Sequence, residues 1–323
     1  MVKIDIISGF LGAGKTTLIK KLLKDGFQGE QVVLIENEFG EIGIDGGFLK
    51  EAGIQIREMN SGCICCSLVG DFGTSLKEVV TKYDPDRILI EPSGVGKLSD
   101  VIKAVQGVQD EVDIKLNSYT TVVDAKKCKM YMKNFGEFFD NQIQYAGAII
   151  MSRTDIASEK KVQESLELLR SLNKDAAIIT TPIENLDGKK LVEVMEHPVS
   201  LEQEMLEEEH EQHHHHDGEC GCGHDHHHHH ADEVFTSWGR ETIKKYTREG
   251  LEKILEALSE SDKYGIILRA KGMLPAEDGT WIYFDMVPEE TEIREGAPEY
   301  TGRLCVIGSK LDEHALEELF GIA

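Results

Sequence analysis

The first half of the chain alternates short, nearly continuous apolar runs with longer segments of helical periodicity. The apolar runs cover residues 2–8, 31–37, 87–93, 119–125, 147–152 and 176–181. Strands that are apolar on both sides are typical of a parallel sheet covered by helices on both faces. We therefore predict an α/β domain over residues 1–200, with a mostly parallel sheet flanked by helices.

The last third of the chain predicts a smaller α+β domain over residues 234–323. Its strand-like runs cover residues 234–238, 264–274, 280–287 and 303–309, and its amphipathic runs cover residues 241–260 and 312–320. Glycine and proline in the segments between these runs support the division. We expect Trp238 and Trp281 to pack inside this domain.

The composition changes abruptly between the two predicted domains. Residues 201–233 hold 11 of the 13 histidines, 11 acidic residues, two cysteines and no Lys or Arg. Such a segment has almost no apolar surface to bury, so we expect a disordered acidic linker. Imidazoles bind Zn²⁺, Ni²⁺ or Co²⁺ in many interchangeable arrangements, which predicts weak accessory metal sites, with an inert linker as the alternative. The accessory ligands would be His213, His214, His215, His216, Cys220, Cys222, His226, His227, His228, His229 and His230.

Charge and cysteine content exclude several classes of protein. The formal net charge of −24 over 323 residues argues against nucleic acid or an anionic membrane as the main partner, since both bind clustered Lys and Arg. The N-terminal apolar run is too short for a signal peptide or a membrane span, so we expect a cytoplasmic protein. Seven cysteines, several of them clustered, favour metal or redox chemistry over a disulfide framework.

The strongest motif is GFLGAGKT, residues 9–16, which follows the first predicted strand and precedes a helical segment. Backbone N–H groups of such a loop cradle phosphates, Lys15 reaches the terminal phosphates, and the Thr16 hydroxyl ligates magnesium. The predicted nucleotide-binding residues here are Gly9, Gly12, Ala13, Gly14, Lys15, Thr16 and Thr17. A glycine-rich turn without a ligand is the alternative.

A second strand, in RILIEPSG (residues 87–94), ends in an acid. Glu91 lies where a carboxylate acts on magnesium through water, and Gly94 can bring a backbone amide to the γ-phosphate. Taken alone, this segment would be a solvated strand end. Together with the loop at residues 9–16 it predicts nucleotide hydrolysis, with Lys15 and Glu91 as the catalytic residues.

Asp155, in IIMSRTD, bears on which nucleotide is bound. An aspartate just beyond a strand can accept both N–H donors on one edge of guanine, an edge that adenine lacks. Asp155 would serve equally well as the N-cap of the helical segment that follows. The residues alone favour the two interpretations equally.

Three cysteines, Cys63, Cys65 and Cys66, crowd into four positions in GCICC. A disulfide within this short loop would be strained. Three thiolates can converge on one soft or borderline ion and leave a fourth position open, which suits metal delivery. Cys63 and Cys66 also have the C-x-x-C spacing of a redox dithiol, which remains an alternative.

The motifs SGFLGAGKTT, ENEFGEIGIDGGFL, GCICC, EPSGVG and SRTD, in this order, resemble those of the CobW-like GTPases. These are relatives of the metal-delivery GTPases for hydrogenase and urease. The resemblance implies a P-loop GTPase domain, a small C-terminal domain, GTP and magnesium as cofactors, and a metallochaperone that delivers a transition metal from the cysteines to a client metalloprotein. Zinc is favoured, with cobalt or nickel as alternatives. The rival functions are a GTP-dependent activator of a corrinoid or other metalloenzyme and a non-enzymatic metal buffer, and self-association that depends on nucleotide or metal is compatible with each.

The chain departs from the resembled family at one motif. That family commonly carries N-K-x-D for guanine recognition, whereas this chain has Ser152, Arg153, Thr154 and Asp155. Ser152 lacks the amide that would bond the base and tie loops together, while the stem of Arg153 can still pack over the base plane. We therefore expect GTP to be the nucleotide, bound more weakly or with less discrimination.

Overall fold

The computed structural model describes residues 1–36, 55–58, 69–109, 111–198, 236–287 and 290–322. The chain divides into two compact units, Met1–Pro198 and Val199–Ala323. The predicted linker over residues 201–233 lies outside the described residues, so its boundaries stay a prediction. Within the described ranges, none of the helices has the length and apolar character needed to cross a membrane.

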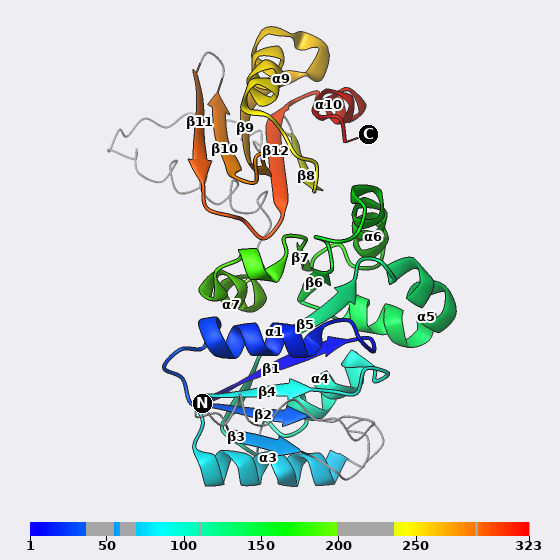
Figure 1. Cartoon of the computed structure of the whole chain (residues 1–323), viewed down its shortest axis with the longest axis vertical. Helices are drawn as coiled ribbons and strands as arrows, with labels where there is room; N and C mark the ends of the chain where they lie inside the picture. The colour runs from blue at the N-terminus through cyan, green and yellow to red at the C-terminus, as the bar shows by residue number, and fades with distance from the viewer. Residues whose placement is uncertain (37–54, 59–68, 110, 199–235, 288–289, 323) are drawn as a thin grey trace, which may run out of the picture. The chain divides into compact units, whose positions relative to one another are not determined.

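The described part of the N-terminal unit forms a seven-stranded parallel sheet in the order β3-β2-β4-β1-β5-β6-β7 (Figure 1). The strands are β1 (Val2–Gly9), β2 (Val32–Glu36), β3 (Gln55–Glu58), β4 (Arg87–Glu91), β5 (Ile114–Asp124), β6 (Ala148–Ser152) and β7 (Ala177–Ile179). This is a P-loop NTPase arrangement, and the predicted fold class is confirmed. The short edge strand β3 was not predicted, because its sequence QIRE lacks a continuous apolar run.

Helices cover both faces of this sheet (Figure 1). They are α1 (Lys15–Lys21), which continues into a π-helical turn (Leu22–Gly26), α3 (Val69–Tyr83), α4 (Leu98–Gln106), α5 (Cys128–Gln144), α6 (Glu159–Leu172) and α7 (Gly188–Glu196). Neighbours in the series α3, α4, α5 and α6 pack against one another, whereas the π-helical turn that continues α1 packs against α7. Right-handed crossovers explain this division, because the chain runs across the sheet from β1 toward β3 and then back toward β7.

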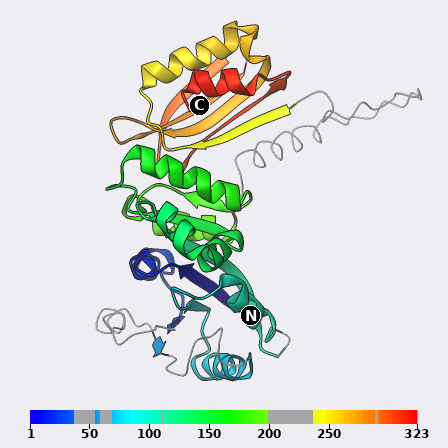
Figure 2. The same ribbon diagram turned by 90° about the vertical axis from the view of Figure 1, so that its right-hand side faces the viewer.

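The C-terminal unit contains, in its described part, a five-stranded antiparallel sheet in the order β11-β10-β9-β12-β8. The strands are β8 (Thr236–Thr242), β9 (Ile266–Pro275), β10 (Trp281–Val287), β11 (Glu290–Gly296) and β12 (Gly302–Ser309). Helices α9 (Arg248–Glu260) and α10 (Glu313–Phe320) cover one face of this sheet (Figure 2). Trp238 and Trp281 are both buried, as expected.

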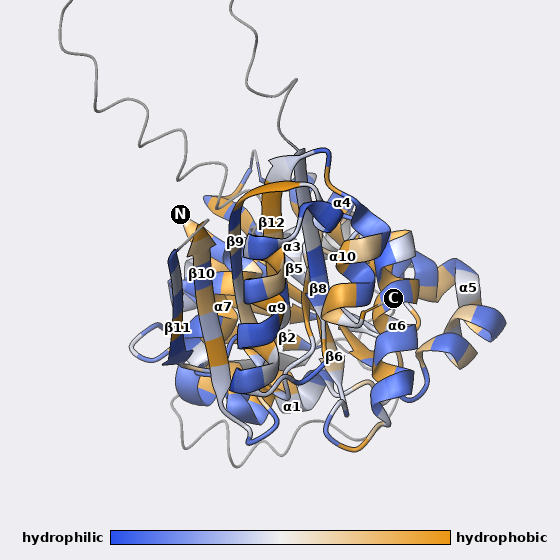
Figure 3. Cartoon of the chain, turned by 90° about the horizontal axis from the view of Figure 1, so that it is seen from above, coloured by the Kyte–Doolittle hydropathy of each residue, from blue (hydrophilic) through white to orange (hydrophobic). Residues whose placement is uncertain are grey.

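Strand β11 was not predicted. Its sequence ETEIREG carries a charge at four of seven positions, and Figure 3 shows it as mostly hydrophilic, in contrast to β12. It pairs with β10 at one edge of the sheet. Edge strands in natural proteins often carry charges that oppose pairing with other chains. In β11 these charges interrupt the apolar pattern by which a strand is predicted.

A buried network of charges closes the amino-terminal end of the parallel sheet. Arg87, at the start of β4, is only 1% exposed. Its guanidinium contacts the carboxylate of Asp5 and lies 2.6 Å from that of Glu30 and 2.8 Å from that of Glu196. It also lies over the ring of Phe27, 4.1 Å from the centroid. Burial alone would lower the pKa of Arg87, but these carboxylates raise it, so the guanidinium stays charged.

The same network joins β1, β4 and β5. Asp5 of β1, buried at 0% exposure, accepts hydrogen bonds from Asn117 at 2.8 Å and from Ser118 at 2.6 Å, both in β5. Because β1 lies between β4 and β5, Asp5 links both neighbours of the central strand. A buried charge is tolerated only when its lone pairs are satisfied in this way.

Glu196, at the end of α7, makes the network sensitive to pH. Partial burial raises the pKa of Glu196, but hydrogen bonds from Arg87, Asn117 and Lys3 outweigh burial, so its pKa lies below the ordinary value. A carboxyl with a lower pKa in the folded state contributes stability above its unfolded pKa of about 4.3, and this is lost as the pH falls through the folded pKa.

We predict that Glu196→Gln lowers the free energy of unfolding at pH 7 by about 1–3 kcal/mol, because Arg87 loses a charged acceptor. The difference from the wild type should shrink as the pH falls from about 4.3, the unfolded pKa, toward the lowered folded pKa of Glu196. Urea denaturation at a series of pH values measures this. Glu193→Gln, at an exposed residue of the same helix, is the control and should change little. A difference that is constant from pH 7 to pH 3 would contradict the role of the Glu196 charge.

Candidate nucleotide-binding site

The loop between β1 and α1 needs glycine at three positions. Gly9, Gly12 and Gly14 have φ values of 146°, 68° and 106°, in the region that side chains disfavour. At Gly9 a β-carbon would lie 2.5 Å from the carbonyl oxygen of Val122 in β5, so only glycine fits. Helix α1 begins at Lys15, and the first backbone N–H groups of a helix have no partner within it. The first turn of α1 can therefore offer backbone N–H groups to a phosphate.

Every carbonyl group of residues 9–14 accepts a hydrogen bond, and three of the donors are local. Lys15 Nζ donates to the Gly9 oxygen, the Ala13 N–H to Phe10 and the Leu18 N–H to Gly14, each at 3.1 Å. Within one trans peptide unit, the C=O group and the N–H group point in opposite directions. Holding these carbonyls therefore also fixes where the amide N–H groups of the loop point.

The other three donors come from distant parts of the chain. The Tyr131 hydroxyl of α5 donates to the Leu11 oxygen at 3.4 Å, Arg153 Nη2 to Gly12 at 2.9 Å and the Ser152 hydroxyl to Ala13 at 2.6 Å. Sequence analysis assigned no role to Tyr131. No local pattern indicates it, because it lies 120 residues from its acceptor.

Lys15 and Glu91, the two predicted catalytic residues, lie close together. Lys15 is buried, and its Nζ lies 3.8 Å from Glu91 Oε1 as well as 3.1 Å from the Gly9 oxygen. Glu91 is the last residue of β4, which pairs with β1 and so ends beside the loop. Thr16 is half-buried and Thr17 is exposed, both in the first turn of α1.

Gly94 lies against the phosphate-binding loop. A β-carbon at Gly94 would lie 3.0 Å from the Leu11 backbone nitrogen and 2.9 Å from its Cδ2 atom, so a side chain there would push the two segments apart. The turn that contains Gly94 is closed by the Gly96 N–H, which donates to the Ser93 oxygen at 2.8 Å. The structure thus brings Glu91 and Gly94 next to the loop at residues 9–16, from which both are far apart in sequence.

Three glutamates lie side by side at the carboxyl edge of the sheet. Glu36, at the end of β2, pairs in register with Glu91 of β4 on one side and with Glu58 of β3 on the other. The chain continues from Glu58 toward the predicted ligands Cys63, Cys65 and Cys66, which lie outside the described residues. The predicted accessory ligands in 213–230 also lie outside them, and the described residues contain no group of three His, Cys, Asp or Glu side chains arranged for a metal.

Asp155 is exposed in the turn between β6 and α6. The N-cap of α6 is Ser158, whose side chain accepts a hydrogen bond from the backbone N–H of Lys161. The alternative interpretation of Asp155 as the cap of this helix is therefore wrong. Both residue types are good caps, and they stand three positions apart, so sequence alone could not choose between them.

The expectation that Ser152 would not tie loops together is also wrong. Its hydroxyl donates to the Ala13 oxygen at 2.6 Å, so a serine makes the link to the phosphate-binding loop. Arg153, with a left-handed φ of 60°, makes a second link, because its guanidinium contacts the Asp124 carboxylate and donates to the Gly12 oxygen at 2.9 Å. The S-R-x-D sequence therefore connects the end of β6 and the turn after it to the loop at residues 9–16.

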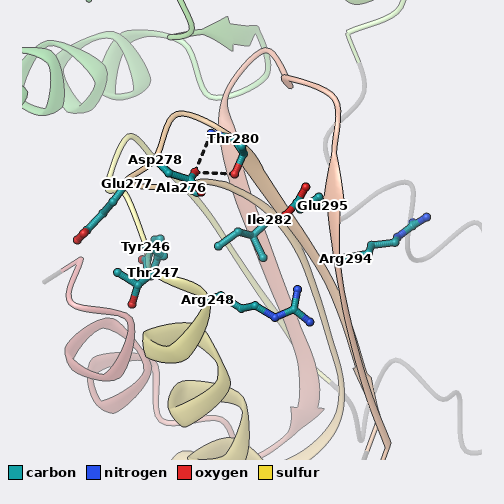
Figure 4. Close-up of a pocket in the computed structure, with 10 residues that line it drawn as sticks. All are labelled: Tyr246, Thr247, Arg248, Ala276, Glu277, Asp278, Thr280, Ile282, Arg294 and Glu295. Carbon is teal, nitrogen blue, oxygen red and sulfur yellow. Dashed lines mark hydrogen bonds between the residues drawn. The ribbon is translucent and has the colours of Figure 1, made fainter.

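A separate pocket of about 290 Å³ lies in the C-terminal unit. Figure 4 shows its lining: Tyr246, Thr247, Arg248, Ala276, Glu277, Asp278, Thr280, Ile282, Arg294 and Glu295. Its floor is apolar, since Tyr246, Ala276 and Ile282 are buried. Its rim carries charges of both signs, and sequence analysis predicted no site there.

Comparison with known proteins identifies the family. The model of the CobW/HypB/UreG nucleotide-binding domain matches residues 3–180. The chain belongs to this family. The model of the cobalamin synthesis protein cobW C-terminal domain matches residues 235–322, which contain the second sheet and its helices.

Individual curated relatives align with part or most of the chain. The zinc chaperone YjiA of Escherichia coli is 30% identical over 194 residues, 58% of this chain and 59% of the relative. The zinc chaperone YeiR of the same organism is 29% identical over 191 residues, 59% of this chain and 58% of the relative. The alignments therefore span less than two thirds of these two proteins. Zinc-regulated GTPase metalloprotein activator 1 of Schizosaccharomyces pombe is 24% identical over 333 residues, 90% of this chain and 76% of the relative.

A comparison with solved structures includes the Zn(II)-bound YjiA GTPase from E. coli. It is 21% identical, with a TM-score of 0.44, and the match covers 99% of this chain and 98% of that one.

We predict that Ser152→Ala weakens nucleotide binding about 5- to 30-fold, because the Ala13 carbonyl loses its donor and the loop loses a fixed orientation. Titration with a fluorescent guanine nucleotide measures this. Ser171→Ala is a matched control, since the Ser171 hydroxyl also donates to a backbone carbonyl, that of Leu168 at 2.7 Å, but on the exposed side of α6. Binding by Ser152→Ala within twofold of the wild type would show that the Ser152 link does not support the loop.

Proposed function

We propose that this chain is a GTP-hydrolysing metallochaperone that binds zinc at Cys63, Cys65 and Cys66 and delivers it to a client metalloprotein. The observation that supports this most directly is the loop at residues 9–16, in which all carbonyls are held by hydrogen bonds while Lys15 lies beside Glu91. The printed names of the relatives, two zinc chaperones and a zinc-regulated GTPase metalloprotein activator, support zinc, GTP and a client protein.

In this proposal the chain prepares the terminal phosphates for attack by water. The loop amides bind the phosphate oxygens, and Lys15 neutralises the charge that develops on the γ-phosphate. The Gly94 N–H donates to the γ-phosphate from the turn that touches Leu11. The Thr16 hydroxyl and Glu91 carry the oxygen donors that magnesium prefers, and they would hold the ion, Thr16 directly and Glu91 through water. When bound, magnesium supplies positive charge to the β- and γ-phosphates.

Guanine recognition falls to the turn after β6. Asp155 is exposed there, and within the described residues no hydrogen bond or ion pair involves its carboxylate, so it can accept both N–H donors on one edge of guanine. Arg153 is fixed by Asp124, which holds its stem beside the position of the base. Ser152 and Arg153 then keep the base side and the phosphate side in one arrangement.

Zinc is the cargo, and its release is linked to the nucleotide through the sheet. Strand β4 ends at Glu91 near the γ-phosphate position, and it pairs with β2, which pairs with β3. The chain leaves β3 toward the three cysteines. In other nucleotide hydrolases, the γ-phosphate holds switch loops that relax when it is lost. A similar relaxation here can therefore be passed on to the metal-binding segment. We place this activity in the cytoplasm, with a protein client and no nucleic acid.

Lys15→Ala should reduce GTP hydrolysis at least about 100-fold, because the charge facing the terminal phosphates is removed. Phosphate release by the full chain measures the rate. Lys20→Ala, in the same helix α1, is the control and should retain normal turnover. Unchanged hydrolysis in Lys15→Ala would remove the basis for the assignment. Negligible turnover by the wild type together with tight zinc binding would favour a metal buffer instead.

Mutations should distinguish the two predicted metal-binding regions, because each variant removes the sites of one region only. Replacing Cys63, Cys65 and Cys66 by serine should abolish one tight, nucleotide-sensitive zinc site, whereas deleting residues 210–230 should remove several weaker ones. The weaker sites should also be lost as the pH falls through about 6.5, where histidine binds protons in place of metal. Chelator titration of both variants, with and without a slowly hydrolysed GTP analogue, measures this. Loss of the tight site in the deletion variant would contradict the proposal.

A further inference from the structure

Helix α5 contacts both loops that border the candidate phosphate position. Near its start, Tyr131 donates its hydroxyl to the Leu11 oxygen of the phosphate-binding loop at 3.4 Å. Near its end, Gln142 donates its side-chain N–H groups to the Gly96 oxygen at 2.8 Å and to the Gly94 oxygen at 3.2 Å. The two halves of α5, which is kinked at Phe135, therefore hold a carbonyl in the first loop and two carbonyls in the second.

The Gln142 side chain has little freedom to turn away. It is 0% exposed, and its Oε1 atom has no hydrogen-bond partner among the described residues. Turning the amide over would point that oxygen at two carbonyl oxygens, so the donors must face the Gly94–Gly96 turn. A buried polar atom without a partner is unfavourable. The two hydrogen bonds that the Gln142 side chain donates therefore offset the cost of burying its oxygen.

Neighbouring contacts anchor the same end of α5 to the sheet and to the turn. The Thr121 hydroxyl of β5 donates to the Gln142 backbone oxygen at 2.7 Å. Asn141 accepts from the Ser99 N–H at 3.2 Å and donates to the Ser99 hydroxyl at 3.0 Å. The segment from Gly94 to Ser99 is thus attached to α5 by two adjacent side chains, and α5 is attached there to a central strand.

We propose that Gln142 is a positioning residue that sets the preference for a nucleoside triphosphate over a diphosphate. This rests on the proposed nucleotide function. The Gly96 N–H donates to the Ser93 oxygen. Because the Ser93 C=O and the Gly94 N–H belong to one trans peptide unit, this bond makes the Gly94 N–H point in the opposite direction. The Gln142 contacts fix the next carbonyl, that of Gly94, and so hold the whole turn against Leu11. A γ-phosphate interacts with this turn, and a diphosphate lacks that group.

Tyr131 provides an internal comparison on the same helix. Its acceptor, the Leu11 carbonyl, belongs to the loop that binds the phosphates common to triphosphate and diphosphate. Loss of the Tyr131 hydroxyl should therefore weaken both nucleotides to a similar extent. Loss of the Gln142 donors should weaken only the triphosphate.

The test compares binding of GDP and of a slowly hydrolysed GTP analogue to the full chain. Gln142→Met keeps the length of the side chain and removes both donors. We expect affinity for the analogue to fall about tenfold, GDP affinity to stay within about twofold, and kcat to fall at least about fivefold. Tyr131→Phe should reduce both affinities by a similar factor of about two to five.

Asn173→Leu is the matched control. Asn173 is also a buried amide, and its side chain donates to the Ile143 oxygen at 2.8 Å and to the Ala146 oxygen at 2.9 Å. Its acceptors lie in neither phosphate loop. This variant should lower Tm and leave the ratio of the two affinities unchanged.

An unchanged ratio of the two affinities in Gln142→Met, whether both affinities fall equally or neither falls, would overturn this inference alone. If the wild type does not bind GTP, the proposed function fails and this inference fails with it. Should Gln142→Met not fold, the half-buried Asn141→Ala variant tests the same segment through its contacts with Ser99. It should reduce the affinity ratio about threefold, and an unchanged ratio there counts equally against the proposal.

Discussion

The candidate site depends first on where the carbonyl groups of residues 9–14 point. Each accepts a hydrogen bond, and three of the donors come from α5, from the last residue of β6 and from the turn after it. One such bond contributes only about 1 kcal/mol net, but six of them act together on one short loop. Together they favour a single arrangement of the loop before a ligand arrives. Preorganised donors of this kind need no rearrangement when negative charge binds.

The arrangement of this loop depends in turn on the position of β1, which is held at two points. In the middle of the strand, Asp5 joins Arg87 of β4 to the side chains of β5. At its carboxyl end, Gly9 approaches the Val122 backbone so closely that no β-carbon fits. A strand rises about 3.3 Å per residue, so these two constraints lie roughly 13 Å apart on one rigid element. The buried charges thus help to position a loop that they do not touch.

The success of sequence analysis depended on how local each feature is. The central strands and the loop at residues 9–16 were predicted because their signals lie within single short segments. The edge strands β3 and β11 were missed because polar residues interrupt their apolar pattern. The donors that hold the loop were missed for a different reason, since Tyr131 and Ser152 lie 120 and 139 residues from their acceptors. Only the folded sheet brings them together.

In the proposed function, GTP and GDP differ only at the γ-phosphate, and a ligand shifts a conformational equilibrium only through contacts that differ between its states. Among the described residues outside the loop at residues 9–16, the turn at Gly94 and the end of β4 at Glu91 border that position. The first leads through Gln142 into α5, and the second leads through β2 to β3, from which the chain continues to the cysteines. In the proposed function, loss of the γ-phosphate therefore affects the metal site through Glu91 or the Gly94 turn, while hydrogen bonds to every carbonyl hold the loop at residues 9–16.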